Sequence, residues 1–168
     1  MTDQTPSDIG ARVLTARNGE ILGDPDGVRD RFMIEGKDAD GRFALVQHLF
    51  APRALAAPMH RHHLEDEYTY VLEGRIGAVL GDEEVFGDPG DLIFKPRNQW
   101  HTFWNAGDEP ASVLEIISPA GLEQFFRTLG TMTEPPDPES MAAMAAPYRC
   151  DADMERTQTV IERHALTF

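Results

Sequence analysis

Histidine and acidic residues gather in one short stretch of the chain. Four of the six histidines lie between residues 59 and 101, and the densest run is His60-Arg61-His62-His63-Leu64-Glu65-Asp66-Glu67. In a β-strand, residues two apart point to the same face, so His60 and His62 converge, while the neighbouring His63 faces away. The polar tetrad 63–66 has the length of a hairpin loop, which would return Glu67 to the side of His62. These residue types at this spacing predict a metal site, with His63 as the rival of His62.

A second segment adds one more imidazole. Pro96-Arg97-Asn98 predicts a turn into a strand over residues 100–105, which places His101 on the sheet. Three neutral imidazoles and one carboxylate suit Fe, Mn, Co, Ni, Cu or Zn better than Ca or Mg, which prefer all-oxygen shells. An octahedral metal with these four ligands keeps positions open for catalysis, whereas a four-coordinate zinc would be closed and structural.

Length and charge limit the kind of protein that carries these residues. The chain has 168 residues, about one domain at ~150 residues each, and its formal net charge is −14. That charge repels phosphate backbones and anionic lipids, so we expect no nucleic-acid or membrane partner. The single cysteine, Cys150, cannot form an internal disulfide, and no apolar leader opens the acidic N-terminus. We therefore expect a cytoplasmic protein.

The middle of the chain reads as an all-β unit. Glycine- and proline-rich turns separate short apolar stretches at roughly ten-residue spacing, too close for the crossovers of a parallel sheet. We predict strands over residues 31–34, 42–50, 67–72, 75–80, 83–86, 91–94, 102–104 and 111–117. This pattern predicts an antiparallel sandwich or barrel.

The last third changes period. Leu122, Phe125, Phe126 and Leu129 recur at three and four residues, which predicts an amphipathic helix, and further helices are expected over 140–146 and 153–164. This segment is too short for a core of its own. We divide the chain into an N-terminal arm (1–30), a β-barrel (31–118) and a C-terminal helical extension packed on the barrel (119–168).

Two motifs in this order resemble those of the cupin superfamily. The first is His60-x-His62, four residues, Glu67, six residues, Gly74. The second is Gly90, five residues, Pro96, x, Asn98, two residues, His101, three residues, Asn105. Asn98 stands where the family usually has glycine, and asparagine tolerates the left-handed conformation better than most residues.

The resemblance, which covers roughly residues 32–117, implies both a fold and a site. The fold would be a cupin-type double-stranded β-helix, a jelly-roll barrel, with one motif pair and hence a single cupin domain. The implied metal ligands are His60, His62, Glu67 and His101, holding one divalent transition metal per chain. The resemblance also implies a homodimer.

The remaining candidates receive plainer interpretations. Thr69 and Val71 share the face of Glu67, and Phe103 shares that of His101, so these three are our predicted pocket lining. Residues 65, 66 and 82–84 read as a solvated turn face. We interpret His48 as a core histidine, His164 as a partner of its helix dipole and Cys150 as a structural thiol.

Three functions compete. The chain resembles the quercetinase-like cupins, which implies a dioxygenase acting on a small organic substrate, with Glu67 also accepting a substrate proton. The apolar side chains of the predicted pocket lining would suit an aromatic one. A metal-assisted isomerase, epimerase or decarboxylase of a small hydroxy or keto acid is the first alternative, and it needs an inward cation such as Arg53 or Arg75. A non-enzymatic, small-molecule-binding cupin is the second.

Overall fold

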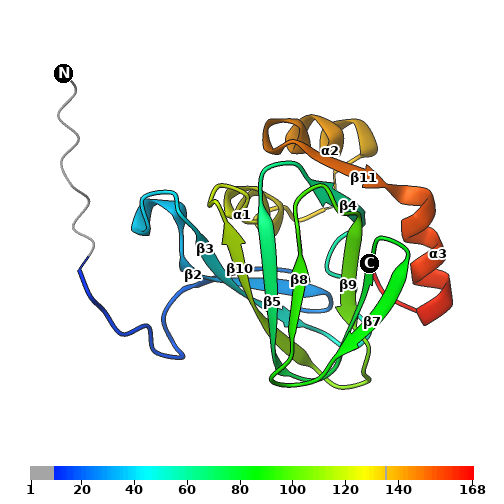
Figure 1. Ribbon diagram of the computed structural model, residues 1–168, viewed down its shortest axis with the longest axis horizontal. Coiled ribbons are helices and arrows are strands. Elements are labelled where there is room, and N and C mark those ends of the chain that lie inside the picture. The colour runs from blue at the N-terminus through cyan, green and yellow to red at the C-terminus, as the bar shows by residue number, and fades with distance from the viewer. Residues whose placement is uncertain (1–9, 135) are drawn as a thin grey trace.

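The computed structural model describes residues 10–134 and 136–168, and two antiparallel sheets dominate it (Figure 1). The six-stranded sheet runs, in spatial order, β1 (Glu20–Gly23), β2 (Val28–Ile34), β3 (Ala44–Phe50), β10 (Ala111–Ser118), β5 (Asp66–Glu73) and β8 (Leu92–Lys95). The five-stranded sheet runs β11 (Cys150–Asp153), β4 (Met59–His62), β9 (His101–Asn105), β6 (Ile76–Leu80) and β7 (Glu83–Gly87). The predicted all-β jelly-roll barrel with a short helical extension is confirmed.

Alternating burial explains why these segments form strands. In β3, Ala44, Val46, His48 and Phe50 are buried, and the residues between them are half-buried. Every second side chain therefore faces the space between the sheets. The core of that space is formed by Phe50, Ala54, Val71, Ile76, Ala78, Ile93, Phe103, Ala111 and Val113.

The turn between β4 and β5 corrects one expectation. The tetrad 63–66 was expected to close a hairpin, but β4 pairs with β9 and β11, whereas β5 pairs with β10 and β8. The turn instead carries the chain from one sheet to the other. Glu67 still returns to His62, because the two strands end at the same corner of the barrel.

The C-terminal segment contributes α1 (Glu123–Gly130), α2 (Pro138–Ala145), α3 (Met154–His164) and strand β11, together with a short 3-10 turn, Ala146–Tyr148. The three predicted helices are confirmed. Asp137 and Asp153 cap α2 and α3 by accepting backbone N–H groups of the first turn. A second 3-10 turn, Gly36–Asp38, follows β2.

The extension packs against the barrel in two places. Helix α3 lies beside the outer face of the five-stranded sheet (Figure 1), where Val160 and Leu166 pack with Met59, Val79 and Trp104. Helix α1 packs near β1 and β2, and Leu122, just before it, joins Phe32, Ala44, Val46 and Ile117.

The N-terminal side is also part of the sheet. Strand β1 and the first residues of β2 fall within residues 1–30 and pair with each other along the sheet edge. Residues 1–9, where we looked for a leader, lie outside the described residues. The division into arm, barrel and extension stays a prediction.

Among the described residues, none of the helices combines the length and the apolar character needed to span a bilayer.

Candidate metal centre

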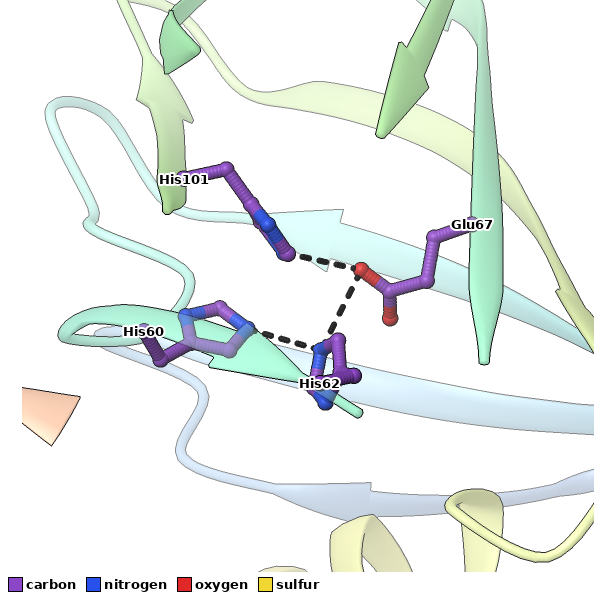
Figure 2. Close-up of side chains that lie close together, drawn as sticks. All are labelled: His60, His62, Glu67 and His101. Carbon is purple, nitrogen blue, oxygen red and sulfur yellow. Dashed lines mark hydrogen bonds and ion pairs between the residues drawn. The ribbon is translucent and has the colours of Figure 1, made fainter. Parts of the chain in front are cut away.

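Four side chains from three strands meet at one corner of the barrel (Figure 2). His60 and His62 come from β4, Glu67 from β5 and His101 from β9. One nitrogen or oxygen of each lies within 4.8 Å of the corresponding atoms of the others. The register explains part of this convergence, because His60 and His101 are direct cross-strand neighbours. The structure thus brings together the four residues named from the motifs.

The pairwise distances have the scale of a coordination sphere. Nε2 of His60 lies 3.0 Å from Nε2 of His62, and Oε2 of Glu67 lies 3.1 Å from Nε2 of His101 and 3.5 Å from Nε2 of His62. Two nitrogen ligands at ~2.1 Å from one metal and at a right angle are about 3.0 Å apart. The donor atoms therefore fit a single transition-metal ion.

The far nitrogen of each imidazole is held from outside the cluster. Nδ1–H of His60 donates to the carbonyl of Pro58 at 2.6 Å, and Nδ1–H of His101 donates to the carbonyl of Gln99 at 3.0 Å. A carbonyl only accepts, so these bonds fix the proton on Nδ1 and turn the Nε2 lone pairs inward. Nδ1 of His62 contacts Sγ of Cys150 at 3.1 Å, so that thiol also touches the centre.

Protonation states also favour metal binding at two of the histidines. Burial lowers the pKa of His60 and of His101 below the ordinary value, which leaves both imidazoles neutral. Burial opposes the charge on His62 as well, but the Glu67 carboxylate outweighs it and raises the pKa of His62 to about 10. A metal must displace that proton, which makes binding pH-dependent.

Glu67 is held from behind by a buried lysine. Nζ of Lys95 is fully buried and lies 3.1 Å from Oε2 of Glu67 and 3.1 Å from Oε1 of Glu115, with the ring of Phe103 3.9 Å away. Burial opposes the ionisation of Glu67, but the Lys95 ammonium and His62 hold its pKa well below the usual range. The carboxylate is thus ionised and oriented, as a metal ligand must be.

The lysine belongs to a larger set of polar side chains on the inner face of the six-stranded sheet. Oε2 of Glu115 accepts from Thr69 at 2.6 Å and lies 4.0 Å from Nε2 of His48, whose Nδ1 bonds Asp30 at 2.6 Å. We call this set the buried polar row: Asp30, His48, Glu115, Thr69 and Lys95. It crosses five neighbouring strands and ends at Glu67.

The turn before His101 takes the conformation expected of it. Asn98 has a φ of +65°, in the left-handed region. Its backbone N–H donates to the carbonyl of His62 at 2.6 Å, which ties the second motif to the first. His63 lies outside the cluster, bonded to Asn98 at 2.8 Å and to Asp151 at 2.9 Å.

A cavity of about 290 Å³ opens at the cluster. His60, His62 and Glu67 lie on its wall, and Phe103 is part of its lining as predicted from parity. The other two predicted lining residues are fully buried elsewhere: Thr69 bonds Glu115, and Val71 packs in the core. Neither is among the residues that line the cavity.

The opposite side of the cavity is apolar and comes from the extension. Phe125, Phe126 and Leu129 of α1 and Met141 and Ala145 of α2 line it. Within the described residues, no lysine or arginine reaches the lining. The cavity therefore suits an apolar compound that presents an oxygen to the cluster.

Sequence reasoning missed several residues of this site. In the sequence, Lys95 looks like an ordinary lysine at the end of a strand. Glu115 interrupts an otherwise apolar strand, and this was the one sequence signal of a buried polar residue. Glu65, expected in a solvated turn, is 4% exposed, and burial raises its pKa. His48 was interpreted as a core histidine, and it is buried, but it also lines the cavity.

The jelly-roll fold and the His₃Glu cluster at one corner of the barrel place the chain among small β-barrel proteins whose inward side chains can hold a metal ion. Residues 46–117 match the model of the cupin domain family. This part of the barrel is therefore similar to a cupin domain.

Two solved structures share the fold. KdgF from Halomonas sp. superimposes with a TM-score of 0.59 at 20% sequence identity, over 68% of this chain and 99% of that one. The polyketide cyclase RemF from Streptomyces resistomycificus gives a TM-score of 0.55 at 26% identity, over 65% of this chain and 80% of that one.

A curated relative matches by sequence. Quercetin 2,3-dioxygenase from Bacillus subtilis (strain 168) is 29% identical over 118 residues, which cover 70% of this chain and 34% of that protein. The chain spans less than half of the length of the curated relatives it matches.

Proposed function

We propose that the chain is a metal-dependent enzyme, a dioxygenase that adds O₂ to a small aromatic substrate. The observation that carries the proposal is the cavity: its polar end is the His₃Glu cluster, and its other walls are largely apolar. The match to a quercetin 2,3-dioxygenase supports the same reaction class. About 150 Å³ of apolar cavity holds benzene, so 290 Å³ accommodates a compound of one or two rings.

In this proposal His60, His62, Glu67 and His101 hold one divalent transition metal. When bound, the metal supplies Lewis-acid polarisation of a substrate oxygen and the redox chemistry that O₂ requires. The chain's own residues do the rest. The backbone carbonyls of Pro58 and Gln99 orient two imidazoles, Lys95 orients Glu67, and the phenylalanines exclude water around the substrate.

The alternative reaction on a hydroxy or keto acid finds less support. It needs a cation in the cavity to hold the substrate carboxylate. Arg53 pairs with Asp108 and Arg75 with Asp88, and both arginine side chains are more than a third exposed and outside the lining. The predicted role of Glu67 as a proton acceptor is also disfavoured, because its Oε2 atom is already paired with the ammonium of Lys95.

Elemental analysis tests the metal site directly. We expect about one transition-metal ion per purified chain and its loss in His101→Ala, because removing one of the four ligands weakens the binding of the metal. His63→Ala is the matched control: it removes a neighbouring imidazole outside the cluster and should keep the metal. A metal-free wild type, or equal metal in His101→Ala, would contradict the site.

Oxygen consumption tests the reaction. The metal-loaded protein should consume O₂ with at least one member of a panel of flavonols, diketones and catechols. Turnover of a hydroxy acid without O₂ would favour the isomerase or decarboxylase alternative. Metal binding with no turnover of either kind would favour a non-enzymatic, small-molecule-binding cupin.

We also propose that the protein is a homodimer. The outward side chains of β5 and β8 form an outer apolar face of Tyr68, Tyr70, Leu72, Leu92 and Phe94, of which the last four are 38–56% exposed. Strand β8 is a sheet edge whose second side has no partner strand in the described residues. In a chain of net charge −14, a second copy meets the least repulsion at this uncharged face.

A further inference from the structure

A histidine–aspartate pair occupies a different wall of the cavity from the His₃Glu cluster. Asp30 of β2 and His48 of β3 are neighbours across the strands, and both line the cavity. Nδ1–H of His48 donates to Oδ1 of Asp30 at 2.6 Å. The pair is assembled from two strands, neither of which carries a residue of the cluster.

The imidazole of His48 is fixed in place by aromatic rings. Its centroid lies 6.2, 5.8 and 5.7 Å from those of Phe50, Phe103 and Phe126. Phe103 and Phe126 line the cavity as well. A substrate ring that packs against these two phenylalanines would therefore lie beside the imidazole.

The second nitrogen of His48 is free to act. The ionised Asp30 can only accept, so it places the His48 proton on Nδ1 and leaves a lone pair on Nε2. In the described part of the chain, Nε2 makes no hydrogen bond, and Oε2 of Glu115 lies 4.0 Å away. His48 is part of the cavity lining, and 7% of its side chain is exposed.

The charges around the ring favour its protonation. Carboxylates face it from β2 (Asp30) and β10 (Glu115), and the ammonium of Lys95 on β8 opposes them from beyond Glu115. Burial disfavours the charged imidazole, but the two carboxylates outweigh it and raise the pKa of His48 above its ordinary value. An imidazolium formed there is stabilised by the Asp30 carboxylate.

We propose that His48, oriented by Asp30, is the catalytic base of this cavity and that the substrate class is an aromatic or enolic hydroxyl compound. The inference rests on the proposed function and names its substrate class. The O–H bond of the substrate breaks, the proton moves to Nε2 of His48, and the electron pair stays on the substrate oxygen. That oxygen then carries the negative charge that a metal in the cluster attracts.

Glu67 is the competing base, and the surroundings of the two groups separate them. Oε2 of Glu67 is already paired with the Lys95 ammonium at 3.1 Å and is one of the ligand atoms of the His₃Glu cluster. Within residues 10–134 and 136–168, His48 has no comparable partner on Nε2, and the carboxylate that orients it is on the far side of the ring. The arrangement is that of a base positioned by a third group.

A chromogenic phenol tests the proton transfer without turnover. We would add 4-nitrocatechol to chelator-treated, metal-free protein at a pH where the free probe is protonated, and record the absorbance of its ionised form. Wild type should ionise the bound probe. His48→Asn keeps a donor toward Asp30 but removes Nε2, and it should reduce the ionised fraction by about tenfold or more.

Three further variants fix the interpretation. Glu67→Gln should still ionise the probe, and His164→Gln, a histidine outside the cavity, should behave as wild type. Asp30→Asn should weaken ionisation and provides a second route if His48→Asn fails to fold, as judged by circular dichroism. Loss of ionisation in Glu67→Gln alone, or equal ionisation in wild type and His48→Asn, would overturn the proposal.

This readout is separate from the metal assignment. If the wild-type protein ionises the probe but contains no metal, the proposed function is wrong and the assignment of His48 as the base is kept. If the protein binds metal and consumes O₂ but His48→Asn does not change probe ionisation, the proposed function is kept and the His48 assignment is wrong.

Discussion

The two sheets of the barrel differ in what covers their outer faces. The five-stranded sheet has an apolar outer face that α3 covers, with Trp104 fully buried beneath it. The six-stranded sheet turns Tyr70, Leu92 and Phe94 outward without a cover in the described residues and keeps the buried polar row inside. The five-stranded sheet is therefore covered on both faces, whereas the six-stranded sheet mixes polar with apolar side chains inside and leaves apolar ones exposed outside.

The six-stranded sheet therefore has two features that lower the stability of the isolated domain. Charges inside a barrel and exposed aromatic side chains outside are both unfavourable in an isolated domain. Each departure therefore calls for a compensating role: the inner row for the site, the outer apolar face for a partner. Four substitutions can break or sharpen this comparison.

Removing the Lys95 charge at the end of the buried polar row has the largest expected effect. Lys95→Met leaves the carboxylates of Glu67 and Glu115 buried without their shared cation, so we expect a loss of about 3–5 kcal/mol in the free energy of unfolding, measured by urea denaturation. Lys37→Met is the control, because that lysine pairs with Glu35 on the surface and should cost less than about 1 kcal/mol. A loss below about 1 kcal/mol for Lys95→Met would show that the row carries little energy.

The covered face of the five-stranded sheet should respond more moderately. Val160→Ala removes buried methyl groups from the side of α3 that packs on the sheet, at an expected cost of about 2 kcal/mol in the same assay. The matched change on the other sheet is Leu92→Ala, which should cost less than about 0.5 kcal/mol where the protein is monomeric. Equal costs would mean that both outer faces are covered.

Self-association sharpens the comparison from the other side. Leu92→Glu together with Phe94→Glu places charge on the outer apolar face, and the dimer dissociation constant should rise about tenfold or more, about 1.4 kcal/mol, by analytical ultracentrifugation. Met154→Glu changes an exposed methionine of α3 and should leave association unaltered. If wild type sediments as a monomer, the homodimer proposal is wrong.

The sequence carried much of the fold and of the cluster, and the reasons are local. Glycine- and proline-rich turns bound β3, β5 and β10, and alternation decides which face each side chain takes. His60, His62, Glu67 and His101 lie in two short motifs, so their convergence needed little knowledge of distant contacts. Strands β1 and β11 escaped prediction because they are short edge strands whose pairing is set by partners elsewhere in the chain.

The rest of the site depends on contacts that the sequence does not order. Lys95 is buried because β8 pairs with β5, which places it beside Glu67, and nothing in its neighbours announces that. The hairpin expected after His62 was wrong for the same reason: a four-residue turn fits either a hairpin or a step between sheets. Phe125 and Met141 reach the cavity through helix packing alone.

The contact between α3 and the five-stranded sheet gives the smallest predicted effect. Oε2 of Glu84 on β7 accepts from His164 at 2.9 Å and from Arg163 at 3.3 Å at the end of α3. The hydrogen bond from His164 lowers the pKa of Glu84 below its ordinary value. Partial burial opposes this shift, and the charge of Arg163 adds to it. The folded pKa thus lies below the unfolded one, so the ion pair stabilises the fold above the unfolded value and not below the folded one.

Glu84→Gln should therefore cost about 0.2–1 kcal/mol at pH 7, because the pair is only partly buried, with 17% of the His164 side chain and 29% of the Glu84 side chain exposed. The difference from wild type should close as the pH falls from about 5 toward 3, when the carboxyl takes up its proton in both states. Urea denaturation at several pH values measures this, with Glu83→Gln, on the exposed neighbouring residue, as control. A difference that persists at acid pH would mean that the amide disturbs α3 packing, and that the charge itself contributes nothing to holding the helix on this sheet.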